Sequence, residues 1–208
     1  MNRRLFLQGS LALAATTVRE LAGAVEGISM SASPYSAVGP FKTERKMVFE
    51  FFMFGCAYCQ QYHPAIFSWG RSIPAPILFE AVPVIVDAES FRQAHAFYAV
   101  KLAMPEKLDD YVMASLRGMK SSGGSFYTEA AFLRDLGIDM RRFEKSWTGP
   151  AMKSALERAN TLMNRYAITA TPSIAIGGEY VLDADKVDGD YGLMMRFASG
   201  LVSRVLES

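Results

Sequence analysis

Residues 51–59 have the sequence Phe-Phe-Met-Phe-Gly-Cys-Ala-Tyr-Cys and contain the only two cysteines of the 208-residue chain, Cys56 and Cys59. Residues 47–54 are apolar or aromatic except for Glu50, which predicts a buried strand. A helix is expected to follow, from the first cysteine to about residue 69. A Cys-x-x-Cys pair at such a junction places the first sulfur at the positive end of the helix, where a thiolate is favoured. The stretch therefore indicates a redox site.

Composition and charge set the class of protein. Half of the residues are hydrophobic, so a chain of this length can bury a sizeable core. Its 22 basic and 21 acidic residues leave a net charge of +1, which provides no electrostatic attraction for a polyanion. We therefore expect an ordinary globular protein with no nucleic-acid partner.

The N-terminus has the features of an export signal. Residues 1–4 carry two arginines, residues 5–18 are mostly apolar but too short to span a membrane, and residues 22–24 form a small-x-small cleavage site. We expect a signal peptide over residues 1–24, cleaved near Ala24. The order Arg-Arg-Leu-Phe-Leu at residues 3–7 resembles a twin-arginine signal. The alternatives are an ordinary secretory signal, an uncleaved anchor, or the first helix of a cytosolic protein.

The chain after the signal predicts an α/β fold. Residues 25–40 are rich in Gly, Ser, Ala and Pro, which predicts a flexible leader with the fold beginning near Phe41. Residues 77–86 form a second apolar run, in which Pro83 must lie at an edge, a bulge or the end of the strand. Strand, helix and strand in this order predict a βαβ unit with a parallel pair. This is the frame of a thioredoxin-like domain.

Two further segments complete the expected organisation. Residues 89–166 have apolar residues at helical spacing and predict an inserted helical subdomain. Residues 171–182 contain two short extended segments joined by Gly-Gly, which predicts a hairpin, and residues 190–206 predict a final helix. The thioredoxin-like domain would then comprise residues 41–88 and 167–208, with a mixed sheet.

A lone Cys-x-x-Cys can also form half of a zinc site. A closed tetrahedral site would need His63 and His95 together, and we expect no metal. His95 is expected to be a packing residue on an apolar helical face, and His63 an ordinary residue on the helix that follows the cysteines. Two buried, inert thiols are a further alternative, but they would not explain why the two cysteines of an exported protein lie so close together in the sequence.

The motifs resemble those of the DsbA family of periplasmic thiol–disulfide oxidoreductases. The resemblance rests on Glu50-Phe51-Phe52-x-Phe54-x-Cys56-x-x-Cys59-x-x-Tyr62, on the helical insertion, and on Thr171-Pro172-Ser173-x-x-x-x-Gly178-x-Tyr180. It covers roughly residues 41–206.

The resemblance implies a role for several residues. Cys56 matches the nucleophile and Cys59 its buried partner, whereas Pro172 matches a cis-proline that faces the disulfide. Glu50 matches a buried acid, whose pKa would be raised and which can relay a proton to or from Cys59. The alternatives are a trans turn at the proline and a Glu50 that reaches solvent.

Two departures from the family bear on the direction of electron flow. Ala57 and Tyr58 stand between the cysteines, where well-known members have Pro and His, and a tyrosine supplies no positive charge at neutral pH. We therefore expect a less acidic Cys56 and a less oxidising couple than in the strongest oxidases. Thr171, before the proline, is more typical of isomerase and reductase members.

The resemblance implies a periplasmic enzyme that oxidises thiols of translocated proteins. The Cys56–Cys59 disulfide would be its only redox group, with no other cofactor. Its partners would be unfolded or partly folded exported proteins and a quinone-linked membrane oxidase, and we expect a monomer. A periplasmic reductase or isomerase, and a thioredoxin-like chaperone or binding module, remain open.

Overall fold

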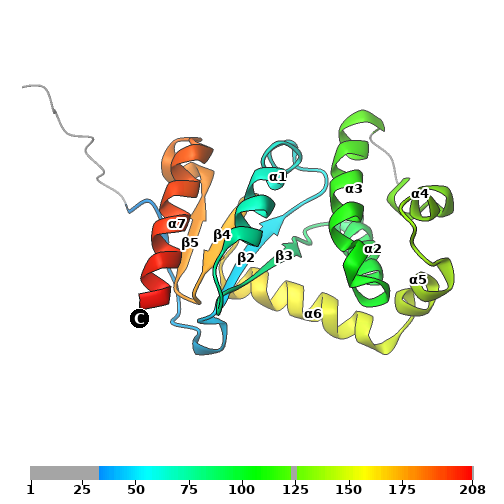
Figure 1. Ribbon diagram of the computed structural model, residues 1–208, viewed down its shortest axis with the longest axis horizontal. Coiled ribbons are helices and arrows are strands. Elements are labelled where there is room, and N and C mark those ends of the chain that lie inside the picture. The colour runs from blue at the N-terminus through cyan, green and yellow to red at the C-terminus, as the bar shows by residue number, and fades with distance from the viewer. Residues whose placement is uncertain (1–32, 123–125, 208) are drawn as a thin grey trace, which may run out of the picture. The chain divides into compact units, whose positions relative to one another are not determined.

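Strand β2, Met47–Phe52, is the buried strand expected before the cysteines. It belongs to a computed structural model that describes residues 33–122 and 126–207 (Figure 1). The expected signal peptide and residues 25–32 of the leader lie outside the described residues. Among the described residues no helix is both long and apolar enough to cross a membrane.

The sheet is mixed, as expected, and its five strands lie in the order β1-β5-β4-β2-β3. Strand β3, Leu78–Pro83, pairs in parallel with β2, and β4, Ser173–Ile176, pairs antiparallel with β2 on the other side. Strand β5, Tyr180–Asp183, completes the predicted hairpin with β4. Proline lacks an N–H, so Pro83 lies at the end of the edge strand β3 rather than inside a longer one.

The first strand corrects the expected extent of the flexible leader. Strand β1, Ser36–Ala37, pairs antiparallel with β5, so the fold begins before Phe41. The contact continues with a backbone hydrogen bond of 2.8 Å from Val38 N to Glu179 O. Two residues are too few to show hydrophobic periodicity, and the sequence pattern therefore missed this strand.

Two helices cover one face of the sheet. Helix α1, Ala57–Ser72, runs on through Pro64 and ends three residues later than expected, and α7, Tyr191–Glu207, is the expected final helix. Ile66 of α1 and Met194 of α7 belong to one buried cluster with residues of β2, β4 and β5. This layer holds α1, and with it the cysteines, against the sheet.

The helical insertion is present as predicted. It contains α2 (Ala88–Ala103), α3 (Leu108–Ser122), α4 (Ala130–Asp135), α5 (Met140–Trp147) and α6 (Pro150–Arg165). Short 3-10 helices are η1 (Lys42–Glu44), η2 (Pro105–Lys107), η3 (Phe126–Thr128) and η4 (Ala184–Val187). Figure 1 shows α2–α5 gathered beyond the β3 edge of the sheet.

The insertion shares a core with the strands that carry the site. Phe52 of β2 and Phe97 of α2 have ring centroids 5.9 Å apart, and Phe54 and Tyr111 of α3 are 6.4 Å apart. His95 is stacked on Trp147 at 4.2 Å, which confirms that it is a packing residue. The segment between β2 and α1 is therefore held from both sides.

Candidate active site

Cys56 and Cys59 occupy the first turn of α1. Cys56 is the N-cap residue, with φ −81° and ψ 120°, and is half-buried, whereas the Cys59 side chain is fully buried. Strand β2 ends at Phe52, and a hydrogen bond of 3.1 Å from Cys56 N to Met53 O closes the turn before the helix. Met53 N also lies 3.5 Å from Cys59 Sγ. One sulfur therefore faces outward while the other lies beneath it, as the spacing predicts.

The two thiols have opposite acidities. The pKa of Cys56 is lowered to about 5, mainly because the Cys59 thiol can donate a hydrogen bond to the Cys56 thiolate; partial burial opposes this. The Thr171 side chain and the N–H groups of Cys59 and Tyr58 stabilise the same charge. The pKa of Cys59 is raised by its hydrogen bond to Cys56 and by its own burial. Cys56 is thus the thiolate at neutral pH, and Cys59 holds the proton.

The peptide bond between Thr171 and Pro172 is cis, as expected. The carbonyl oxygen of Thr171 lies 3.3 Å from Cys56 Sγ, although the two residues are 115 positions apart. Strand β4 begins directly after Pro172 and pairs with β2, and this pairing places the proline beside the cysteines. The structure thus brings Cys56, Thr171 and Pro172 together.

Glu50 is buried in β2, which excludes the alternative of a side chain that reaches solvent. Its carboxylate Oε1 lies 2.8 Å from His63 Nδ1, and the two side chains are 0% and 1% exposed. Burial raises the pKa of Glu50, and the neighbouring His63 opposes this rise. Glu50 Oε2 is buried and makes no hydrogen bond within the described part of the chain.

The interpretation of His63 as an ordinary helix residue was wrong. A signal for its role was present, because residues four apart on a helix lie on one face, so His63 must share the buried face of Cys59. A buried carboxyl also requires a polar partner, and a helix packed against β2 can supply one to Glu50. The sequence did not show which residue this would be.

Three tyrosines lie beside the cysteines. Tyr58 is 60% exposed, whereas the rings of Tyr62 and Tyr191 are stacked at 3.6 Å with an interplanar angle of 12°. Tyr58 stacks more loosely on Tyr191, at 6.1 Å. Ala57, the other residue between the cysteines, is exposed and leaves the approach to Cys56 open. The position of Tyr191 beside the active-site helix was not predicted, because no local sequence pattern links α7 to the cysteines.

A zinc site is not assembled around the cysteines. His63 is bound to Glu50, and His95 Nε2 lies 2.9 Å from the carbonyl oxygen of Trp147. Within residues 33–122 and 126–207 no three side chains of the His, Cys, Asp or Glu type are grouped to hold a metal ion.

An acidic thiol over a buried one, at a helix N-terminus and beside a cis-proline, defines a thioredoxin-like dithiol site. Such a site supports thiol–disulfide exchange. Residues 59–189 match the family model of the DSBA-like thioredoxin domain, which is most of the chain. The chain belongs to this family and is a thiol:disulfide oxidoreductase.

Relatives and solved structures agree with this assignment. The chain is 27% identical to a thiol:disulfide interchange protein DsbA of Burkholderia cepacia over 134 residues, which are 64% of this chain and 63% of the relative. It is 24% identical to DsbA of Pseudomonas aeruginosa over 193 residues, 90% of each chain. The crystal structure of Pseudomonas aeruginosa DsbA matches with a TM-score of 0.72 at 22% identity, covering 85% of this chain and 95% of that one. The crystal structure of DsbA from Xylella fastidiosa matches with a TM-score of 0.66 at 20% identity, covering 78% of this chain and 87% of that one. The structural matches establish the fold.

Proposed function

We propose that this protein oxidises pairs of thiols in exported proteins and uses the Cys56–Cys59 disulfide as the oxidant. The observation that carries the proposal is the opposite acidity of the two thiols, with the pKa of Cys56 lowered to about 5 and that of Cys59 raised. A stabilised Cys56 thiolate favours the reduced enzyme, and a couple whose reduced form is stabilised is oxidising.

The reaction takes place in two exchanges. A client thiolate attacks Cys56 Sγ, forms a mixed disulfide and releases Cys59 as a thiolate. A second client thiolate then attacks the client sulfur of the mixed disulfide and releases Cys56 as a thiolate. Two electrons pass from the client to the enzyme, and the client leaves with a new disulfide.

Cys59 must gain a proton when it is released, because a buried thiolate is unfavourable. Glu50 is the acid that we assign to this step. Its raised pKa favours the protonated form, and its Oε2 has no other hydrogen bond within the described residues. His63 holds the other oxygen and thereby orients the carboxyl group. In the reverse exchange the same group accepts the proton from Cys59.

The cellular setting of the proposal follows the DsbA relatives and the N-terminal sequence. The enzyme would act in the periplasm as a monomer, after cleavage of a signal peptide near Ala24. A quinone-linked membrane oxidase would remove the two electrons and restore the disulfide. No other cofactor is required, because the two sulfurs carry both electrons.

A second candidate is a periplasmic reductase or isomerase. It is favoured by Tyr58, which is 60% exposed and supplies no positive charge to the Cys56 thiolate. A chaperone or binding module with dispensable cysteines is a third candidate, but the acidity of Cys56 provides no support for it.

The equilibrium potential of the cysteine couple against glutathione distinguishes the first two candidates. A value well above that of thioredoxin, which is about −270 mV, supports the oxidase, and a value near it supports the reductase. Refolding of a reduced client with Cys56→Ala tests the third. The oxidase requires that this variant loses activity, whereas a chaperone would retain it.

A further inference from the structure

A pocket opens directly beside Pro172 on the surface of the active site. Its volume is about 320 Å³, and its walls come from α1, the cis-proline loop, the 3-10 helix η4 and the start of α7. Tyr58, Tyr62 and Tyr191 form one wall, and Asp185 forms part of another. A client bound to Cys56 must place the residues next to its own cysteine at this pocket, because the Thr171 carbonyl oxygen lies 3.3 Å from Cys56 Sγ.

The aromatic wall is fixed on one side and open on the other. The stack of Tyr62 and Tyr191 at 3.6 Å holds two of the rings, whereas Tyr58 is 60% exposed and presents its ring to solvent. Aromatic faces attract cations, most strongly where water is partly excluded. Apolar side chains can also contact such rings, so the charge around the pocket decides between the two.

The surroundings of the pocket carry a negative charge. Residues 183–190 contain four aspartates and one lysine. Residues 53–70 and 167–182, which supply the walls from α1 and the cis-proline loop, contain no lysine and no arginine. Two of the aspartates are occupied as caps: Asp183 accepts from Lys186 N and Asp190 from Leu193 N.

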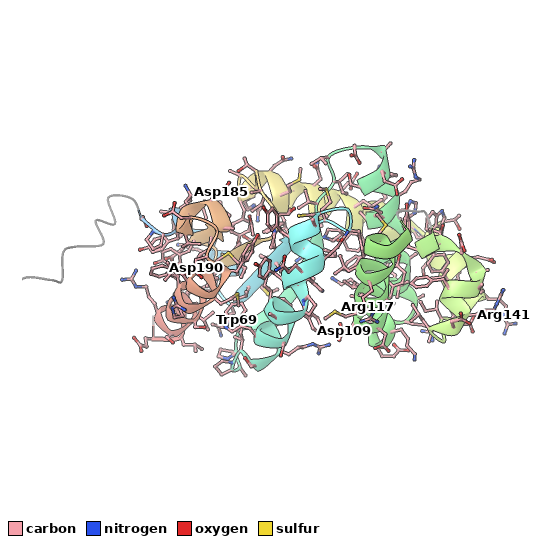
Figure 2. The ribbon with its side chains drawn as sticks, turned by 90° about the horizontal axis from the view of Figure 1, so that it is seen from above. Trp69, Asp109, Arg117, Arg141, Asp185 and Asp190 are labelled. Atoms are coloured by element: carbon pink, nitrogen blue, oxygen red, sulfur yellow. The ribbon has the colours of Figure 1, made fainter. Side chains whose placement is uncertain are left out.

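Asp185 is the acid that lines the pocket. It is exposed on the segment between β5 and α7 (Figure 2), and among the described residues no ion pair holds it. A carboxylate in the same pocket as the exposed ring of Tyr58 fits the ammonium or guanidinium group of a long basic side chain, whose aliphatic stem can lie along the ring.

We propose that this pocket binds a lysine or arginine that flanks the reacting cysteine of the client. The inference rests on the proposed function, since it names the client class of the same site. A flanking cation also stabilises the client thiolate, so such a cysteine is ionised at the moment it attacks Cys56. The tyrosines and Asp185 thus select clients, and they take no part in the electron transfer itself.

The test uses the oxidised full-length protein and matched peptides with two cysteines. The residue that flanks the first cysteine is lysine, norleucine or glutamate, placed before the cysteine in one set and after it in a second. The rate at which each peptide reduces the enzyme is divided by the rate at which the same peptide reduces a small uncharged disulfide. This ratio corrects for the intrinsic reactivity of the peptide thiol. Reduction by uncharged dithiothreitol provides the baseline for the enzyme.

In at least one set we expect the lysine peptide to react about fivefold to tenfold faster than the glutamate peptide and faster than the norleucine peptide at low salt. The preference should fall at about 1 M salt, where the Debye length is only about 3 Å. Asp185→Asn should reduce the ratio of the lysine-peptide rate to the glutamate-peptide rate at least twofold. Tyr58→Leu should reduce this ratio independently. Asp188→Asn, in the same exposed segment but outside the pocket, should reduce the ratio less than Asp185→Asn does.

Several outcomes would overturn the inference. Equal corrected rates for the three peptides would exclude a charge-selective pocket. A norleucine peptide as fast as the lysine peptide would show an apolar subsite, and an unchanged ratio in Asp185→Asn would exclude the assigned carboxylate. If dithiothreitol itself fails to reduce the Cys56–Cys59 disulfide, the proposed function has failed rather than this inference.

Discussion

Glu50 and His63 form a buried pair beneath the active-site helix, with Oε1 and Nδ1 separated by 2.8 Å. Glu50 belongs to β2, while His63 lies one turn beyond Cys59 on α1. The ring of Phe52 lies 5.1 Å from the imidazole and that of Phe67 lies 5.7 Å from it, so water is largely excluded. This polar contact inside an apolar layer therefore links strand β2 to helix α1, which carries the two cysteines.

Replacing Glu50 by Gln tests the proton relay. The amide keeps the shape and a hydrogen bond to His63 but has no proton to transfer, so we expect exchange to slow by at least about tenfold. The free energy of unfolding should change by no more than about 1 kcal/mol, because the amide is neutral, like the protonated carboxyl, and keeps a hydrogen bond to His63. Stopped-flow exchange and urea unfolding measure the two effects.

Glu44→Gln is the matched control for this variant. Glu44 is also buried, but it binds Arg165 and Tyr166 rather than a residue of α1. The Glu44→Gln substitution should leave the rate of thiol–disulfide exchange unchanged. A Glu50→Gln protein that exchanges at the wild-type rate, or that no longer folds, would show that Glu50 is structural.

His63→Leu should destabilise the protein in a pH-dependent manner. The variant leaves Glu50 buried without its partner, and burial then raises the pKa of this carboxyl further. A carboxyl with a raised folded-state pKa contributes stability at low pH, and this contribution is lost as the pH rises through that pKa. We expect a loss of about 3–5 kcal/mol at pH 8 and a clearly smaller loss at pH 5, measured by urea unfolding. The same loss at both pH values would indicate that His63 only fills space.

The Cys56 thiol should titrate near pH 5. Its pKa is lowered to about 5, so ultraviolet absorbance of the thiolate and alkylation by iodoacetamide should both have their midpoint there. Because the folded-state pKa is depressed, the extra stability of the reduced protein is present above the ordinary thiol pKa of about 8.5 and is lost as the pH falls through about 5. The oxidised protein has no such thiol and is the control. A titration near the ordinary thiol value would remove the main support for an oxidase.

Tyr58→His should lower the pKa of Cys56 further and make the couple more oxidising. An imidazolium two residues after Cys56 stabilises the thiolate but not the disulfide. Tyr58 is 60% exposed, so the new side chain requires no repacking of the core. Tyr58→Gln, which is polar but uncharged, is the control. The prediction fails if the thiolate absorbance of all three proteins titrates at the same pH.

Two glycine substitutions should have opposite effects on stability. At Gly178, which has φ +71°, an added Cβ would lie 2.4 Å from the carbonyl oxygen of Phe41. Gly178→Ala should therefore destabilise the protein by about 1–3 kcal/mol. Gly200→Ala, in α7 and with no atom of another element within 4 Å of the new Cβ, should stabilise it by up to about 1 kcal/mol. Chemical denaturation of both variants measures these changes, and the Gly178 variant checks the contact between Phe41 and the turn of the hairpin.

Much of this protein was predictable because its signals are local. The cysteine spacing, the buried strand before it, the Gly-Gly hairpin and the helical insertion each depend on residues that are near one another in the chain. Ser36–Ala37 was not predictable, because two residues held by backbone pairing carry no side-chain pattern. The end of α1 at Ser72 was misplaced by three residues, since packing against the sheet extends helices beyond their local signals.

The sequence by itself determined that a dithiol lies between a buried strand and a helix. Spacing along a helix is set by its backbone geometry, so one thiol had to lie above the other. Only the tertiary structure decided what surrounds the two sulfurs. Thr171 reaches Cys56 across 115 positions, His63 rather than any other polar residue meets Glu50, and Tyr191 stacks on Tyr62 from the last helix. These contacts depend on how the sheet and helices pack, and packing joins residues whose positions in the chain give no sign that they meet.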